Sequence, residues 1–390
     1  MPPGGRKGGA GSIGLAQPGA GQEKARGGGY IFAGARPTIQ RVGFDQLDGS
    51  TLYTYGARPT IQRVGCLFVM TTATTRAALL GLAVGDALGV PVEFIGRDVR
   101  RRDPVLGLRA YGTHHQPAGT WSDDSSLTFC LAETLATKGL DVTDAASRFV
   151  RWQDAGYWTA HGRVFDIGIA TAEALQRVRR GVAPLHAGGK DEYSNGNGSL
   201  MRILPLTFAT KNWSVSERFR ACQEMSSITH AHIRSVLACF IYTEMARQLL
   251  MTADKLAAYK AMQKLVNEFL QAKNLVSELE LRQFHRILEN PYGAYSIKPL
   301  TEYQEEEIKS TGYVVHTLEA ALWCLLRHDS YAATVLAAVN LGDDTDTTGA
   351  VAGGLAGLAY GEAGISPEWL AGLARRADIE DLAERLARAG

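Results

Sequence analysis

Residues 70–390 of the sequence predict an all-α fold. Apolar residues in this part of the chain recur at spacings of three and four, which is the pattern of a helix with one buried face. Ala and Leu, which favour helices, dominate these stretches, and the apolar–polar alternation typical of strands is scarce. Glycine and proline clusters separate one periodic stretch from the next. We therefore expect a single, mostly helical domain.

The expected helices follow one another along the chain. The first comes after a threonine-rich stretch behind Met70, which suits a helix N-terminus. The last is rich in Gly and Ala, so its backbone can approach a neighbouring helix closely. The apolar spacing places helices at 76–89, 126–137, 142–154, 165–179, 233–250, 254–272, 314–327, 330–339 and 349–360.

Residues 1–69 differ from the rest of the chain. They are rich in glycine and poor in long apolar residues, so we expect a disordered, low-complexity extension. The segment GARPTIQRVG occurs at 34–43 and again at 56–65, which is too short a repeat for a solenoid. Three interpretations stay open: an upstream segment outside the working protein, a tail without a specific role, or a basic arm that docks into a partner.

The composition argues against several classes of protein. The 390 residues include 41 basic and 40 acidic side chains, so a dedicated nucleic-acid binder is not predicted. No apolar run is unbroken over about 18 residues, which argues against a transmembrane helix, and Arg6 and Lys7 are not followed by the apolar core of a secretory signal. The 5 cysteines are scattered, as reduced thiols usually are. We expect a cytoplasmic protein without membrane attachment.

The first chemical motif is GTWSDDSS, residues 119–126. It places Asp123 and Asp124 behind Ser122 at the start of an expected helix. One interpretation is helix capping, because Asp and Ser satisfy the free N–H groups of a first turn. The other is a cation site, because adjacent carboxylates beside hydroxyls are ligands that hard divalent cations prefer.

The second motif is NLGDDTDTTGA, residues 340–350. Its three aspartates would repel one another unless a cation or a helix N-terminus compensates them. The spacing allows Asp344, Asp346 and Thr347 to point at one centre, and a solvated acidic loop is the alternative. Ligands that are all oxygen favour Mg²⁺ or Mn²⁺. The two motifs together hold enough carboxylates for a two-metal site.

Three other features carry chemistry. In SNGNGSLMR, residues 194–202, glycines alternate with Asn and Ser, so backbone N–H groups could cradle a phosphate; a plain turn is the alternative. In GDALGVPVEF, residues 85–94, Glu93 lies between apolar residues, which would raise its pKa and suit acid–base catalysis. His230 and His232 are two positions apart and would diverge on a helix, so a shared metal is not expected.

Seven segments in order resemble the ADP-ribosylglycohydrolases, in particular the bacterial dinitrogenase reductase-activating type. The resemblance covers roughly residues 76–361 and implies orthogonally packed helices around a binuclear Mg²⁺ or Mn²⁺ centre. Where relatives often have GYVVDTL, this chain has His316. The segments are GLAVGDALGVPVEF, GTWSDDSS, FDIG, GNGSLMR, SSITHAH, GYVVHTLEAALW and NLGDDTDTTGA.

The resemblance implies roles for individual residues. Glu93 and Asp166 would be the catalytic acids. The metal ligands would be Ser122, Asp123, Asp124, Asp344, Asp346 and Thr347. The contacts to ADP-ribose would come from Gly196, Asn197, Gly198, Ser199, Met201, His230 and Tyr313.

The resemblance also implies an activity, the metal-dependent hydrolysis of the N-glycosidic bond between ADP-ribose and a modified protein arginine. The same chemistry on a serine, nucleobase or small-molecule linkage is one alternative. Another is an immunity protein that binds an ADP-ribosyltransferase toxin, for which residues 1–69 are the only pointer. The partner would be an ADP-ribosylated protein or small molecule, and carboxylates alone would also allow a metal phosphohydrolase.

Overall fold

The computed structural model describes residues 72–288 and 298–390. Across these residues the regular structure is helical, with four isolated bridges and no strand. The all-α prediction is therefore confirmed. The expected disordered extension at 1–69 and its repeated segment lie outside the described residues.

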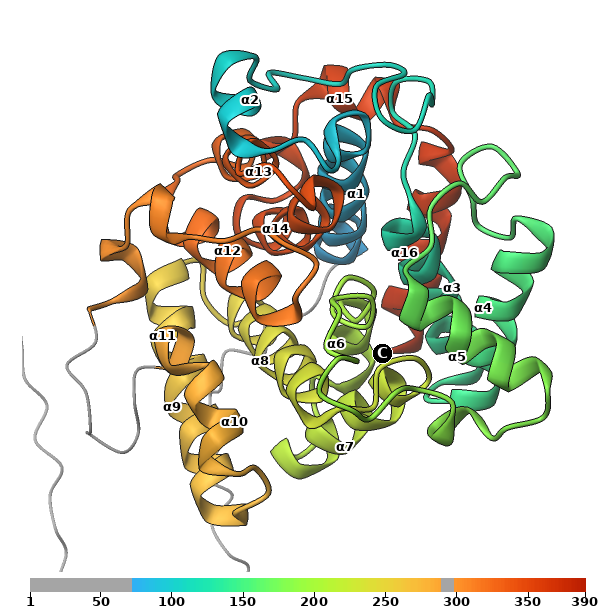
Figure 1. The fold of residues 1–390 in the computed structure, drawn as a ribbon, viewed down its shortest axis with the longest axis vertical. Helices are drawn as coiled ribbons and strands as arrows, with labels where there is room; N and C mark the ends of the chain where they lie inside the picture. Colours follow the sequence, from blue (N-terminus) through green and yellow to red (C-terminus); the bar gives the residue numbers. More distant parts are fainter. Residues whose placement is uncertain (1–71, 289–297) are drawn as a thin grey trace, which may run out of the picture. The chain divides into compact units, whose positions relative to one another are not determined.

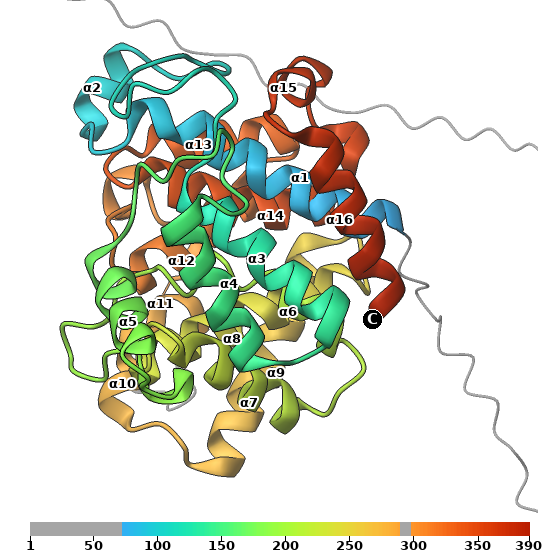
Figure 2. The same ribbon diagram turned by 90° about the vertical axis from the view of Figure 1, so that its right-hand side faces the viewer.

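Two helices that are far apart in sequence run side by side through the domain (Figures 1 and 2). They are α1 (Thr72–Gly89) and α14 (Thr345–Tyr360). A Cβ added at Gly85 would lie 2.1 Å from the carbonyl oxygen of Gly349, and one added at Gly81 would lie 2.5 Å from that of Gly353. We call these four residues the glycine seam. The helices touch backbone to backbone there, which only glycine allows.

Some of the other helices pack on this pair, and the rest pack on those (Figure 1). The green group consists of α3 (Asp123–Lys138), α4 (Val142–Ala155) and α5 (Ile169–Arg179). The orange helices α12 (Val314–Arg327) and α13 (Tyr331–Asn340) pack on α14, and the red helix α16 (Arg376–Ala389) lies beside α1 and α3. The remaining helices are α2 (Arg97–Arg102), α6 (Pro205–Thr210), α7 (Val215–Ser227), α8 (Ile233–Leu249), α9 (Lys255–Lys273), α10 (Glu278–Gln283), α11 (His285–Leu288) and α15 (Pro367–Gly372).

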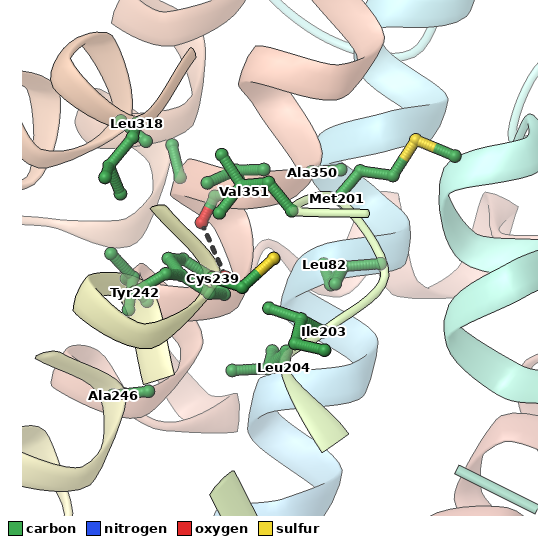
Figure 3. Packing of buried hydrophobic residues seen from close by; sticks show 14 of the residues in the cluster. Leu82, Met201, Ile203, Leu204, Cys239, Tyr242, Ala246, Leu318, Ala350 and Val351 are labelled. Carbon is green, nitrogen blue, oxygen red and sulfur yellow. Dashed lines mark hydrogen bonds between the residues drawn. The ribbon is translucent and has the colours of Figure 1, made fainter. Parts of the chain in front are cut away.

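Side chains from several helices meet in one apolar core (Figure 3). Leu82 from α1, Leu318 from α12 and Leu204 from the turn before α6 are each fully buried. Tyr242 of α8 donates its hydroxyl to the carbonyl oxygen of Val351 on α14 at 3.0 Å, the dashed line in Figure 3. This bond satisfies the one polar atom that the tyrosine brings into the core.

The first helix is unusually apolar. By length and composition, Thr72–Val92 would suffice to cross a membrane, but 94% of it is buried inside the domain. A helix that is apolar all round and covered by its neighbours is typical of the core of a globular protein.

The expected helices are all present, and the differences lie at their starts. The helix expected from residue 165 begins at Ile169, because Gly168 is extended, with φ −64° and ψ 142°. The helix expected from residue 349 already begins at Thr345, so Asp346 and Thr347 belong to its first turn. Seven helices were not predicted: α2, α6, α7, α10, α11, α15 and α16.

Candidate active site

The start of α3 carries the first acidic motif. Ser122 is its N-cap, and the Ser122 hydroxyl accepts the N–H of Asp124 at 3.3 Å. The capping interpretation therefore holds for Ser122, whereas the carboxylates of Asp123 and Asp124 are not used for it. Asp124 Oδ1 is buried and has no hydrogen-bond partner among the described residues. A buried carboxylate oxygen without a partner is costly unless a cation compensates it.

The start of α14 brings the second motif to the first. The hydroxyl of Thr347 lies 3.4 Å from Asp124 Oδ2, so the two helix starts face each other. Asn197 donates its side-chain N–H to Asp344 Oδ2 at 2.8 Å, which fixes that carboxylate. Asp344 Oδ1 and Asp346 Oδ2 are also buried without a partner in the described part of the chain.

A further aspartate, Asp86 of α1, was not foreseen. Its carboxylate accepts the main-chain N–H of Ser122 at 2.9 Å and that of Ser125 at 3.0 Å. Asp86 thus holds the first turn of α3 from a different helix. Carboxylate oxygens of Asp86, Asp124 and Asp346 lie within 4.8 Å of one another, and the same holds for Glu93, Asp344 and Asp346.

Burial dominates the electrostatics of these carboxylates. It raises the pKa of Asp123, Asp124 and Asp346 well above the usual range, and neighbouring negative charges add to the effect. Burial also raises the pKa of Asp344, and that of Asp86 to about 6. Buried carboxylates with unpaired oxygens and two hydroxyl neighbours fit a hard divalent cation.

A cavity of about 360 Å³ opens beside these groups. It brings together residues from seven separate stretches of sequence, including both predicted catalytic acids. Its lining consists of Glu93, Phe94, Asp123, Asp166, Ile167, Gly168, Ile169, Ala170, Thr171, Gly196, Asn197, Gly198, Met201, His230, Gly312, Asp344 and Thr347.

Glu93 lies in the cavity lining close to Asp344 and Asp346, with only 4% of its surface exposed. Burial raises its pKa to about 7, and a hydrogen bond from His114 lowers it in part. The bond joins His114 Nε2 to Glu93 Oε2. His114 also packs against Phe165, with ring centroids 5.2 Å apart, next to Asp166. His114 was not foreseen, because it lies in a loop with no periodic pattern.

The glycine-rich segment contributes Gly196, Asn197, Gly198 and Met201 to the wall of the cavity. Its Gly198 packs on His230: a Cβ at Gly198 would lie 2.8 Å from Cε1 of that ring. Burial lowers the pKa of His230 to about 3, and the charge of Arg202 adds to this, so the imidazole is neutral. Arg202 is itself buried, and its guanidinium donates to the carbonyl oxygens of Gly198 and Met225.

Some predicted ligand contacts lie beside the cavity rather than on it. Ser199 is fully buried and its hydroxyl accepts from Ser226 at 2.9 Å. Tyr313 caps α12 behind Gly312, and His316 packs edge-on against it with ring centroids 4.9 Å apart. His232 accepts the N–H of Arg234 at the start of α8, so it serves as a helix cap.

Ser122 likewise lies outside the lining of this cavity. It borders a second, much smaller hollow of about 10 Å³, which Asp123 and Asp166 share. Asp124 and Asp346 are the innermost of the predicted metal ligands, each 1% exposed. Of the six predicted ligands, Asp123, Asp344 and Thr347 line the cavity, whereas the other three are buried outside its lining.

The fold and this cavity define a hydrolase-type site, in which buried carboxylates able to hold a cation adjoin a proton-carrying acid. The comparison with known proteins identifies the family. The chain belongs to the ADP-ribosylglycohydrolase family, whose model matches residues 71–390. This confirms the resemblance drawn from the motifs, and the protein is an enzyme of that class.

Individual relatives agree with this assignment. An ADP-ribosylarginine hydrolase Tri1 of Pseudomonas putida is 34% identical over 82% of this chain and 80% of its own length. An ADP-ribosyl-[dinitrogen reductase] glycohydrolase of Rhodospirillum rubrum is 30% identical over 78% and 91%. A solved structure described as an ADP-ribosylglycohydrolase-related protein complex matches with a TM-score of 0.66 at 33% identity, covering 82% of this chain and 98% of that one.

Proposed function

We propose that this enzyme hydrolyses the N-glycosidic bond between ADP-ribose and a modified arginine. The observation that carries the proposal is the cavity in which Glu93 and Asp166 meet the acidic helix starts and the glycine-rich segment. The names of the relatives, which specify ADP-ribosylarginine and ADP-ribosylated dinitrogen reductase, support arginine over other linkages.

Two divalent cations, Mg²⁺ or Mn²⁺, are proposed to bind at the facing helix starts. The ligands would be the oxygens of Ser122, Asp123, Asp124, Asp344, Asp346 and Thr347. The unpaired oxygens of Asp124, Asp344 and Asp346 support this set. Such cations, when bound, orient the ribose diol and stabilise negative charge on oxygen. Asp86 and Asn197 would keep the ligands in place, through Ser122 and Ser125 on one side and Asp344 on the other.

Glu93 is proposed to exchange protons during the reaction, because a pKa of about 7 lets it hold or release one at neutral pH. In the hydrolysis, the bond from the anomeric carbon to the guanidine nitrogen breaks and the electron pair stays on nitrogen. The oxygen of water bonds to the anomeric carbon through an oxocarbenium-like state. Glu93 takes a proton from that water and then gives it up to solvent, and the departing guanidine takes up one proton from solvent. Asp166, which lines the cavity, would stabilise the positive sugar.

The glycine-rich segment is proposed to hold the diphosphate of ADP-ribose. Gly196, Asn197 and Gly198 line the cavity with backbone that carries no bulky side chain. The neutral His230 and the side chain of Met201 complete this wall. Ser199 and Tyr313 do not line the cavity and would support the residues of this wall.

The test is the release of ADP-ribose from ADP-ribosylated arginine and from ADP-ribosylated serine, with Mg²⁺, with Mn²⁺ and with EDTA. We expect release from arginine that depends on the metal, and none from Asp123→Ala or Asp344→Ala. Activity retained in either variant would contradict the proposed metal ligands. Release from serine alone would replace the substrate and keep the site.

The proposed partner is an ADP-ribosylated protein in the cytoplasm. Cys130, Cys222, Cys239 and Cys324 are buried free thiols, as a reducing compartment permits. The alternative of an immunity protein that blocks an ADP-ribosyltransferase depends on residues 1–69, outside the described residues. A pull-down with and without those residues tests it.

A further inference from the structure

Two large apolar side chains stand at the mouth of the cavity. Phe94 and Ile169 both line it, yet 69% of Phe94 and 80% of Ile169 is exposed to solvent. Single exposed apolar residues are common on protein surfaces. Two of them on the rim of one catalytic cavity indicate a surface that a bound molecule covers.

The chain holds Phe94 in this place with an uncommon backbone. Its φ is 62°, in the left-handed region, where a bulky side chain is a genuine outlier. The N–H of Phe94 donates to the carbonyl oxygen of Asp343 at 2.7 Å, and the N–H of Asp343 donates back to Ile95 at 3.1 Å. Asp343 has a left-handed φ of 59° as well. Strain of this kind persists where surrounding structure imposes it, and it gathers at functional sites.

The position of the two side chains indicates which part of the substrate they meet. Phe94 follows Glu93 directly, and Ile169 lies three residues after Asp166 at the start of α5. These are the two acids proposed to flank the bond that breaks. The group bonded to ADP-ribose must therefore leave the cavity past Phe94 and Ile169.

We propose that Phe94 and Ile169 form a docking rim for the polypeptide that surrounds the modified arginine. This inference rests on the proposed function, and it selects a protein over a small ADP-ribosylated molecule as the substrate. The arginine side chain that leaves ends in a polar guanidine group, and it has too little apolar surface to cover both rim residues. The surface of a folded protein offers apolar area to both, and exposed aromatic side chains are typical anchors of protein interfaces.

The test compares two substrates of the same linkage, ADP-ribosylated dinitrogen reductase and free ADP-ribosyl-arginine. Phe94→Asn removes the ring but tolerates the left-handed backbone, and Ile169→Ser removes the second side chain. Leu106→Ser is the matched control, since Leu106 is 75% exposed and does not line the cavity. Melting temperatures confirm that each variant folds.

For the double variant we expect KM for the modified protein to rise by about tenfold or more, as for loss of interface anchors, with kcat unchanged. Turnover of ADP-ribosyl-arginine should fall by a clearly smaller factor, because this substrate has no polypeptide to contact the rim. Equal losses on both substrates, or no loss on either, would overturn the docking rim. The unaltered enzyme tests the proposed function separately. If it does not hydrolyse ADP-ribosyl-arginine, the proposed function is wrong. If it does, but the variants affect both substrates equally, the docking rim is wrong.

Discussion

Ser125 donates both its main-chain N–H and its hydroxyl to one carboxylate oxygen of Asp86, at 3.0 and 2.6 Å. The donor lies in the first turn of α3 and the acceptor in the last turn of α1. The bond therefore ties the helix that presents Asp123 and Asp124 to the helix that forms the glycine seam. A carboxylate that caps a helix from another element fixes position as well as satisfying N–H groups.

Asp86→Asn should weaken metal binding by about 10- to 100-fold, as loss of a group that orients metal ligands does. An amide cannot accept from all three donors of Ser122 and Ser125 with equal strength. The measurement is the Kd for Mn²⁺ by calorimetry. The control is Asp141→Asn, because Asp141 caps α4 through two N–H groups away from the cavity. If both variants bind Mn²⁺ equally well, Asp86 has no positioning role.

Stabilisation by metal should grow with pH. Burial raises the pKa of Asp86 to about 6 and of Glu93 to about 7, above their ordinary values near 4. Between the ordinary pKa near 4 and these raised values, the two carboxyl groups lose their protons in the unfolded chain before they lose them in the folded protein. The free energy of unfolding of the metal-free protein therefore falls as pH rises through this range. A cation compensates the carboxylates once they are charged. We expect Mg²⁺ to raise Tm more at pH 8 than at pH 5, and equal shifts at both would contradict this.

His114→Phe should move the pH profile of the enzyme. The replacement keeps aromatic packing against Phe165 but removes the hydrogen bond that lowers the pKa of Glu93. The pKa of Glu93 should therefore rise. Since Glu93 must be deprotonated to accept a proton, activity at pH 6 should fall more than activity at pH 9. The measurement is kcat/KM against pH, with the exposed neighbour His115→Asn as control. An unshifted acidic limb would exclude this role for His114.

Gly85→Ala should destabilise the domain by about 1–3 kcal/mol, the cost of overpacking a filled interior. The new Cβ would lie 2.1 Å from the carbonyl oxygen of Gly349, so α1 and α14 must separate. Chemical denaturation measures the change. Gly96→Ala is the control, because a Cβ there would meet no heavy atom within 4 Å. A stable Gly85→Ala variant would show that the helices can part without loss.

The sequence predicted helices where one apolar face repeats, and it predicted both acidic motifs because their residues are adjacent. It did not predict α16, although Ile379, Leu382, Ala383 and Leu386 have helical spacing and are buried. These four positions have the same apolar spacing as the helices that were predicted. For Asp86 there was no such signal. A single aspartate in an apolar helix does not indicate that its carboxylate accepts N–H groups from the start of α3.

The same limit applies to His114 and to Asp166. Helical periodicity predicted a start at residue 165, whereas Gly168 is extended. The helix α5 therefore begins at Ile169, and Asp166 lies in a loop that lines the cavity. The partner of His114 is 21 positions away, and only the folded loop brings the two together. Contacts between loops depend on tertiary structure, which local patterns do not encode.

The glycine seam has a consequence for the distance between two carboxylates of the site. Asp86 follows Gly85 directly, and Asp346 lies three residues before Gly349, so each acid is anchored beside a backbone-to-backbone contact. Bare backbone has no rotamers to exchange. The spacing between Asp86 and Asp346 thus depends on the contact between two main chains, and mutations that repack side chains elsewhere in the core should leave that spacing unchanged.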